Sequence, residues 1–327
     1  MDQANKKILK IAFLVLKVAI SVALLVYLFS KAGGMAIIGN AVMLSPFHLA
    51  AASILYILAS FLSTLRWKMF IPVRLGTRSL FSMYMIGTFF NVCLPSTIGG
   101  DAVKAYCLSR ALKGNLSNDG DVQFESKHNI VSVASVFMDR YVGLAALLLI
   151  GLAVFPFGYH TLEKTQVLWI MPALFAGFIA GSFILFKFRL GTRLKIMLTV
   201  HDYFELYFGK KAVLIKGFMY SIVIQMVAIF SVYVLALGLN LNISFLSLVI
   251  FLPIVFIVTL IPVSISGIGL REGAFVVLFG TIGIAPDKAM TLSLIWFVSV
   301  VIGSLWGLFE YLRFKHQFGV NIKEESL

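Results

Sequence analysis

LPSTIGGDAVKAY, at residues 94–106, is the stretch from which the predicted topology follows. It places a proline, two adjacent glycines and two charged residues directly after the apolar run SLFSMYMIGTFFNVC at 79–93. Proline and glycine interrupt helices, and Arg78 precedes the run while Arg110 and Lys113 follow it. Basic residues gather on the cytoplasmic side of membrane proteins, so the chain must return to the side from which it came. We therefore expect a re-entrant helical hairpin, with arms at about 79–94 and 101–112 and the tip PSTIGG.

The composition of the whole chain requires a membrane. Of the 327 residues, 60% are hydrophobic and only 13% are charged, which lies outside the usual range of a soluble domain. Crossing a bilayer takes about 20 apolar residues, and runs of that kind fall near 11–29, 46–65, 130–155, 167–186, 213–238 and 289–311. The sequence predicts an all-α polytopic membrane protein with about six spanning helices.

The net charge is +13, and the lysines and arginines that produce it are spread over several loops and are not concentrated in one domain. With the N-terminus in the cytoplasm, nearly all lysines and arginines fall inside, and only Lys31, Lys164 and Lys288 fall outside. This pattern indicates topology. We expect both termini and the loops at 113–129 and 187–212 in the cytoplasm, where the cations favour anionic inner-leaflet lipids, and we expect no nucleic-acid partner.

A second break, IPVSISGIGLREG at 261–273, faces the other way. The span at 213–238 ends outside, residues 245–262 run inward, SISGIG interrupts them, and 270–284 lead back out. Two interrupted helices in corresponding positions of two halves are typical of inverted-repeat transporters, whose substrate site lies near the middle of the membrane. The sequence predicts one membrane domain over 1–327, with two re-entrant hairpins and pseudo-repeat halves at about 1–160 and 161–316.

Six charged residues lie within or next to the predicted apolar layer, where each ionised side chain costs on the order of 2.5 to 3.5 kcal/mol even on a lenient scale. Glycines at the two breaks would let a ligand approach the backbone, and helix starts offer free N–H groups to an anion. We expect a substrate-binding site that consists of Gly99, Gly100, Asp101, Lys104, Asp139, Arg140, Gly267, Gly269, Arg271 and Glu272.

The favoured ligand of this site is a phosphate. Arg140 and Arg271 are the expected contacts, because a guanidinium group can bind phosphate oxygens in a bidentate manner. Asp139 and Glu272 would orient these arginines, receive a cationic amine or carry a coupling proton. In a structural alternative, the three anions and three cations neutralise one another and fix the hairpins to the span at 130–155. Asp101 could also serve as a helix N-cap.

Other motifs carry less information. Cys93 and Cys107 lack any zinc or redox spacing, and the sequence suggests neither a metal nor a cofactor. The pairs Gly177 with Gly181 and Gly303 with Gly307 form GxxxG motifs, which predict close helix packing.

The order of these motifs resembles the flippase-like membrane domain of the lysylphosphatidylglycerol synthase family. The motifs are P-x-x-x-G-G-D at 95–101 with Lys104 three positions on, the acid–arginine pair at 139–140, and P-x-x-x-S-G-x-G-x-R-E at 262–272. The resemblance covers the chain roughly from its second span to its last. It implies a stand-alone membrane region, without the soluble domain that transfers lysine in full-length members.

The resemblance implies a phospholipid flippase of the bacterial cytoplasmic membrane. Its substrate would be an aminoacylated or other phosphate-headed lipid, and its work would be transport and not chemistry. Two alternatives are a membrane-embedded head-group transferase, which the short outside loops disfavour, and a non-catalytic partner of a separate synthase. The protein partners considered are that synthase and a second copy of the chain.

Overall fold

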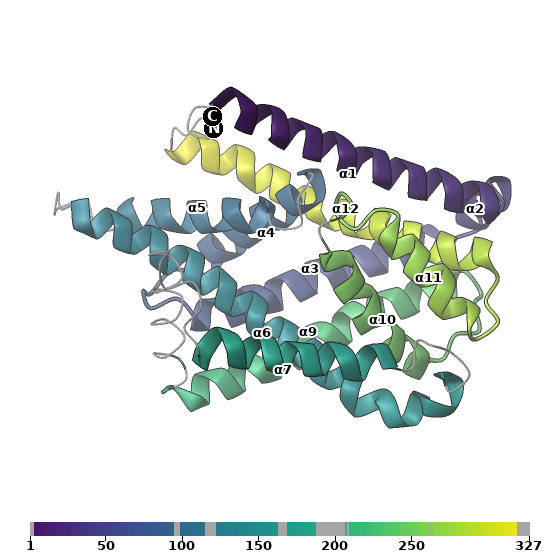
Figure 1. The fold of residues 1–327 in the computed structure, drawn as a ribbon. Coiled ribbons are helices and arrows are strands. Elements are labelled where there is room, and N and C mark those ends of the chain that lie inside the picture. The colour runs from purple at the N-terminus through teal and green to yellow at the C-terminus, as the bar shows by residue number, and fades with distance from the viewer. Residues whose placement is uncertain are drawn as a thin grey trace.

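The computed structural model describes residues 3–94, 99–114, 122–162, 169–187, 207, 209–261 and 263–318. Within these ranges the regular elements are all helices, drawn in Figure 1. In chain order they are α1 (Gln3–Lys31), α2 (Gly34–Val42), α3 (Pro46–Met69), α4 (Thr77–Cys93), α5 (Gly99–Gly114), α6 (Val122–Leu162), α7 (Ile170–Lys187), α9 (Lys211–Gly238), α10 (Phe245–Leu260), α11 (Leu270–Gly280) and α12 (Pro286–Phe318). The all-α class predicted from the sequence is confirmed.

Four of these helices are long and apolar enough to cross a membrane, over Pro46–Met69, Asn129–Phe157, Lys211–Gly238 and Pro286–Arg313. A fifth crossing is added if α1 and α2 count as one span, although they meet at an angle of 85°. The predicted span at 167–186 corresponds to α7, whose apolar part among the described residues, Pro172–Ile184, falls below the length of a crossing. The chain is therefore a polytopic membrane protein with four or five candidate spans among its described residues.

Helices extend into the segments that connect the predicted spans. The segment 30–45, between the first two predicted spans, contains helix α2. In the predicted loop 113–129, α5 continues to Gly114 and α6 begins at Val122, while residues 115–121 lie outside the described residues. Of the predicted loop 187–212, residues 188–206 and 208 lie outside the described residues as well, and α9 begins at Lys211.

Helices α4 and α5 form the first predicted hairpin, and residues 95–98 of its tip lie outside the described residues. At 1.5 Å per residue, the 17 residues of α4 span about 26 Å, which is shorter than the hydrocarbon core of about 30 Å. The two arms approach closely: a Cβ atom at Gly100 would overlap the carbonyl oxygen of Gly87. The Gly100 N–H also donates to Asn91 Oδ1 at 3.0 Å. The paired glycines of the quoted stretch thus allow the backbones of the hairpin to touch.

Helices α10 and α11 form the second hairpin, with 16 and 11 residues. The break between them uses backbone conformations with positive φ, at Ser266 (φ 50°), Gly267 (φ 75°) and Gly269 (φ 87°). Glycine adopts such conformations without steric cost, whereas serine adopts them rarely. Both interrupted helices predicted from the sequence are therefore present, and Pro262 lies outside the described residues.

The two breaks touch inside the bundle. The hydroxyl of Ser266 donates toward the carbonyl oxygens of Asn91 and Leu94, at 3.2 and 3.3 Å. Helix α1 contacts the second break, because the Ile265 N–H donates to Ser21 Oγ at 2.9 Å. In Figure 1 the α4–α5 hairpin lies toward the left end of the bundle and the α10–α11 hairpin toward the right end. The hairpins therefore enter from opposite ends and meet at their tips.

The packing of the helices follows the pattern of an inverted repeat. Helix α4 packs on α12 while α10 packs on α6, and α3 lies against α9 between them. If α3, α4, α5 and α6 are matched in order with α9, α10, α11 and α12, the contact of α4 with α12 corresponds to the contact of α10 with α6. The contact of α3 with α9 then corresponds to itself. In Figure 1, α1 begins and α12 ends at the same end of the bundle. The boundaries of the halves at about 1–160 and 161–316 stay a prediction.

Among the described residues, the GxxxG motif of α12 marks a close helix contact and that of α7 does not. A Cβ atom at Gly303 would lie 2.6 Å from Tyr56 Cδ1, and one at Gly307 would overlap the carbonyl oxygen of Met85. At Gly177 and Gly181 no atom lies within 4 Å of such a Cβ position among the described residues. The prediction of close packing is confirmed for α12, and the described residues give no close contact at the two glycines of α7.

Candidate functional site

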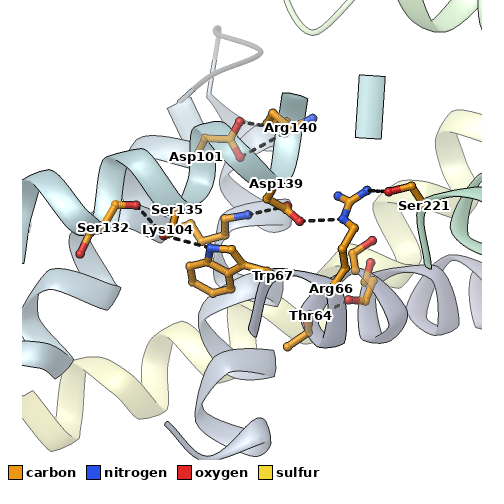
Figure 2. A network of polar contacts seen from close by, with 12 residues as sticks. Thr64, Arg66, Trp67, Asp101, Lys104, Ser132, Ser135, Asp139, Arg140 and Ser221 are labelled. Atoms are coloured by element: carbon orange, nitrogen blue, oxygen red, sulfur yellow. Dashed lines mark hydrogen bonds and ion pairs between the residues drawn. The ribbon is translucent and has the colours of Figure 1, made fainter. Parts of the chain in front are cut away.

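Asp139 is the centre of a buried polar network between α3, α5, α6 and α9, shown in Figure 2. Its side chain is 1% exposed and contacts two cations: Arg66 Nε lies 2.8 Å from Oδ1, and Lys104 Nζ lies 3.4 Å from Oδ2. An isolated carboxylate at this depth would be strongly destabilised. The two cations supply the partners that make its burial tolerable.

Arg66 is a functional candidate that the sequence reasoning missed. It lies in the last turn of α3, where its charge suggested a cytoplasmic residue, yet it is only 5% exposed. Its Nη1 donates to Ser221 Oγ on α9 at 2.8 Å. A Cβ atom at Gly143 would lie 2.9 Å from the same nitrogen, so the glycine on α6 leaves space for the guanidinium group.

A signal for the burial of Arg66 does exist in the sequence. Ser60, Ser63 and Thr64 interrupt an otherwise apolar span just before it, and all three are buried. The spacing i, i+3, i+4 places residues on one helix face, and a polar face in a membrane span indicates contact with protein and not with lipid.

Lys104 is held between aromatic rings in addition to its ion pair. Its Nζ lies 4.6 Å from the centre of the Trp67 ring and 4.3 Å from that of Tyr84, and its side chain is 3% exposed. Ammonium groups are attracted to the faces of aromatic rings. The indole N–H of Trp67 donates to Ser135 Oγ at 3.2 Å, which fixes the ring in place.

Arg140 and Asp101 form a bidentate pair beside this network. Arg140 Nε lies 2.8 Å from Oδ2, and Nη2 lies 3.1 Å from Oδ1. The Arg140 side chain is 52% exposed and that of Asp101 is 12% exposed. Among the hydrogen bonds of the described residues, none uses Arg140 Nη1. Arg140 is therefore the cation of the network that a ligand can reach.

Arg271 and Glu272 form a separate, enclosed group at the start of α11. Arg271 contacts Glu272 Oε1 through Nε at 3.0 Å and through Nη2 at 2.5 Å, and its Nε also lies 3.2 Å from Ser293 Oγ. The Phe297 ring covers the guanidinium group at 4.5 Å. The other Glu272 oxygen accepts the Gly269 N–H at 2.7 Å. With side chains 8% and 0% exposed, this pair resembles the predicted structural network more than an open phosphate site.

The structure therefore divides the predicted site residues into two groups. Asp101, Lys104, Asp139 and Arg140 come together with Arg66, whereas Arg271 and Glu272 pair with each other. Among the described residues no ion pair joins the two groups, and the hydrogen bonds of Ser266 connect the breaks through backbone carbonyls. The predicted phosphate contact of Arg271 stays a prediction.

The four glycines predicted to admit a ligand lie against protein. A Cβ atom at Gly99 would lie 2.8 Å from Leu94 Cδ1, one at Gly267 would lie 2.8 Å from Thr259 Cβ, and one at Gly269 would lie 2.7 Å from Leu24 Cβ. Gly100 faces α4, as described above. These glycines allow close helix packing, and their role in substrate binding stays a prediction.

Depth and charge distinguish the first group. Arg140 lies three residues before Gly143, the middle residue of the span Asn129–Phe157, and so about 4.5 Å from it along the helix axis. Arg66, Lys104 and Arg140 face Asp101 and Asp139, so the group carries one formal positive charge in excess.

Among the described residues no cluster of three or more His, Cys, Asp or Glu could hold a metal ion.

Together, the fold and this site define a multi-pass helical membrane protein with two interrupted helices that meet beside buried charges. A family model described as the lysylphosphatidylglycerol synthase TM region matches residues 14–307. The chain belongs to this family, as the motifs predicted.

Two proteins of Methanothermobacter thermautotrophicus, both named UPF0104 membrane protein, are similar to this chain. One is 22% identical over 303 residues, which covers 78% of this chain and 83% of the relative. The other is 25% identical over 281 residues, which covers 77% of this chain and 78% of the relative. No solved structure matches the chain.

Proposed function

We propose that this protein moves a phosphate-headed lipid across the cytoplasmic membrane. The observation that carries the proposal is the group around Asp139, in which three cations face two anions near the middle of a span. An excess buried charge is costly in a membrane and marks a functional site by default. An anionic ligand would remove that cost.

Arg140 supplies the contact for the phosphate. Its exposed guanidinium group offers Nη1 to a ligand while Asp101 holds Nε and Nη2. Arginine is well suited to phosphate, because its donors are fixed in a plane and its charge is not lost at any physiological pH. Asp101 orients the guanidinium group, a role that the sequence suggested for Asp139 and Glu272.

The inverted repeat supplies a route for transport. In transporters with interrupted helices and inverted repeats, one repeat moves against the other around a site at mid-depth. Here each hairpin packs on the last helix of the opposite half, α4 on α12 and α10 on α6. A displacement of the halves would therefore move the α10–α11 hairpin relative to the charged group, because Asp101 and Lys104 of that group lie on the α4–α5 hairpin. The family name, which refers to a phospholipid synthase, supports a lipid as the substrate.

The test is transport of labelled phospholipid in reconstituted vesicles with leaflet-resolved detection. We expect Arg140→Ala to slow transport of a phosphate-headed lipid by about tenfold or more, equivalent to about 1.4 kcal/mol or more, and Arg140→Lys to retain part of the rate. Arg110→Ala is the matched control, because Arg110 is an exposed arginine on α5 without an ion pair among the described residues. Equal rates for wild type and Arg140→Ala, with equal protein in the vesicles, would refute the proposal.

The same vesicles test the transferase alternative. A transferase would alter the head group, and mass spectrometry of the extracted lipids would detect the product. Transport of an unaltered lipid supports the proposed function.

A further inference from the structure

The acids of the charged group are already paired with its own cations, as Figure 2 shows. Asp139 is 1% exposed, and its two oxygens contact Arg66 at 2.8 Å and Lys104 at 3.4 Å. Asp101 is 12% exposed and binds Arg140 through both oxygens, at 2.8 and 3.1 Å. An ammonium group that approached Asp101 would therefore also approach the like charge of the Arg140 guanidinium group. Neither acid offers a cationic amine an oxygen without a cation beside it.

The aromatic rings of the group are occupied in the same way. The face of a tryptophan or tyrosine ring can attract an ammonium group where no carboxylate is available. In this protein the Trp67 and Tyr84 rings already hold Lys104 Nζ, which lies 4.6 and 4.3 Å from their centres. An amine of a ligand would have to displace Lys104 from both rings before it could bind there.

The other acids do not provide an amine site beside this group. Glu272 is 0% exposed, and its oxygens accept from Arg271 and from the Gly269 N–H. Asp287 and Glu310, whose side chains the structure also describes, lie near the two ends of the α12 span, whereas the charged group lies near the middle of the α6 span. Within the described part of the chain, the acids close to Arg140 therefore all have a cation of their own.

The net charge of the group favours the same selectivity. Its three cations outnumber its two acids by one, and the most exposed member is the cation Arg140, whose side chain is 52% exposed. Charges act on one another over several ångströms where the effective dielectric constant is that of a protein and not of water. A phosphate is attracted to this group, and a positive charge on the same head group is repelled by it.

We propose that the site selects lipids whose head group carries a phosphate and no amine. This inference rests on the proposed function and chooses between the two substrate classes that the sequence left open, an aminoacylated lipid and another phosphate-headed lipid. The excess cation is the repulsive element that excludes the aminoacylated class, since specificity is a difference between two affinities. The substrate is then a lipid of net negative charge, such as phosphatidylglycerol, and its lysylated form binds more weakly.

Three lipids with the same acyl chains separate the effect of charge from that of size. Phosphatidylglycerol has no amine, lysylphosphatidylglycerol adds two amines, and the lysyl lipid acetylated on both amines keeps the bulk without the positive charge. In titrations of the purified full chain in detergent, we expect the lysyl lipid to bind at least about tenfold more weakly than its acetylated form, which corresponds to about 1.4 kcal/mol. Equal or tighter binding of the lysyl lipid, or no binding of phosphatidylglycerol, would overturn the inference.

Lys104→Met tests the source of the selectivity. It removes one cation and with it the excess charge, so we expect the preference for the acetylated lipid to fall to about threefold or less. Arg110→Ala is the matched control, because it also removes a cation from α5, but Arg110 is exposed and has no ion pair among the described residues. An unchanged preference in Lys104→Met protein that elutes like wild type would contradict the charge argument. If that variant does not fold, the comparison of the lysyl and acetylated lipids on wild type decides.

The vesicle assay separates this inference from the proposed function. Transport of phosphatidylglycerol and of the lysyl lipid at equal rates would overturn the selectivity and leave the proposed function in place. If neither lipid is transported while the binding preference is present, the proposed function fails and the selectivity of the site stands.

Discussion

Removal of the charge at Asp139 gives the sharpest test of the buried network. The substitution Asp139→Asn retains the size of the side chain and one carbonyl oxygen, but it leaves Arg66 and Lys104 without an anion at 2.8 and 3.4 Å. Breaking a buried ion pair by removing one partner costs about 3 to 5 kcal/mol, because a buried charge stays uncompensated. Asp139 compensates two cations, so we expect a loss within this range or above it.

The comparison with Asp101→Asn fixes the scale of the effect. Asp101 pairs with Arg140, whose side chain is 52% exposed, so its guanidinium group can find other partners when the acid is gone. Asp139 compensates two buried cations, whereas Asp101 compensates one cation that is half exposed. We therefore expect Asp139→Asn to destabilise the protein more than Asp101→Asn does.

The assay is thermal unfolding of purified protein in detergent, followed by size-exclusion chromatography of heated samples. At about 2 °C per kcal/mol, the lower value for large domains, Asp139→Asn should lower the apparent midpoint by roughly 6 to 10 °C. Adding Lys104→Met to Asp139→Asn should recover part of the loss, because one unpaired cation is removed while its aliphatic volume is kept. Equal midpoints for Asp139→Asn and Asp101→Asn would refute the view that Asp139 neutralises buried cations.

Three further predictions concern the excess charge and the two breaks. Lys104→Met alone should reduce the affinity for a phosphate-headed lipid, measured by titration in detergent, by about tenfold, because the network loses its excess positive charge; an unchanged affinity would contradict the charge argument. Gly100→Ala should destabilise the protein by at least about 1 to 3 kcal/mol in thermal unfolding, because its Cβ atom would overlap the Gly87 carbonyl oxygen and overpacking has costs of this size. Gly177→Ala is its control, since no atom lies within 4 Å of that Cβ position among the described residues and alanine favours a helix over glycine. Ser266→Ala should cost about 1 kcal/mol of unfolding free energy through the lost hydrogen bonds to Asn91 and Leu94, and a gain in stability would show that these bonds do not hold the breaks together.

Much of the fold could be predicted from local patterns. Hydropathy identified the four helices that the structure shows to be long and apolar enough to cross a membrane, since an apolar run of sufficient length is excluded from water wherever it occurs. The glycines and prolines at 95–100 and 262–269 identified both breaks, and the basic residues around the first break predicted that the chain turns back. The span predicted at 167–186 stays a prediction, because the apolar part of α7 among the described residues, Pro172–Ile184, has only 13 residues.

The sequence was sufficient to predict charges in the apolar layer and to identify Asp101, Lys104, Asp139 and Arg140 among them. Which of these charges meet depends on the packing of the helices. Arg66 is 73 residues from Asp139 in the chain, and their contact depends on how α3 and α6 are rotated about their axes. The tertiary structure also enclosed Arg271 with Glu272 and left Arg140 exposed. Hydropathy indicates whether a residue is removed from water. Which ion-pair partner a buried charged side chain finds depends on distances of a few ångströms between helices that are far apart in the sequence.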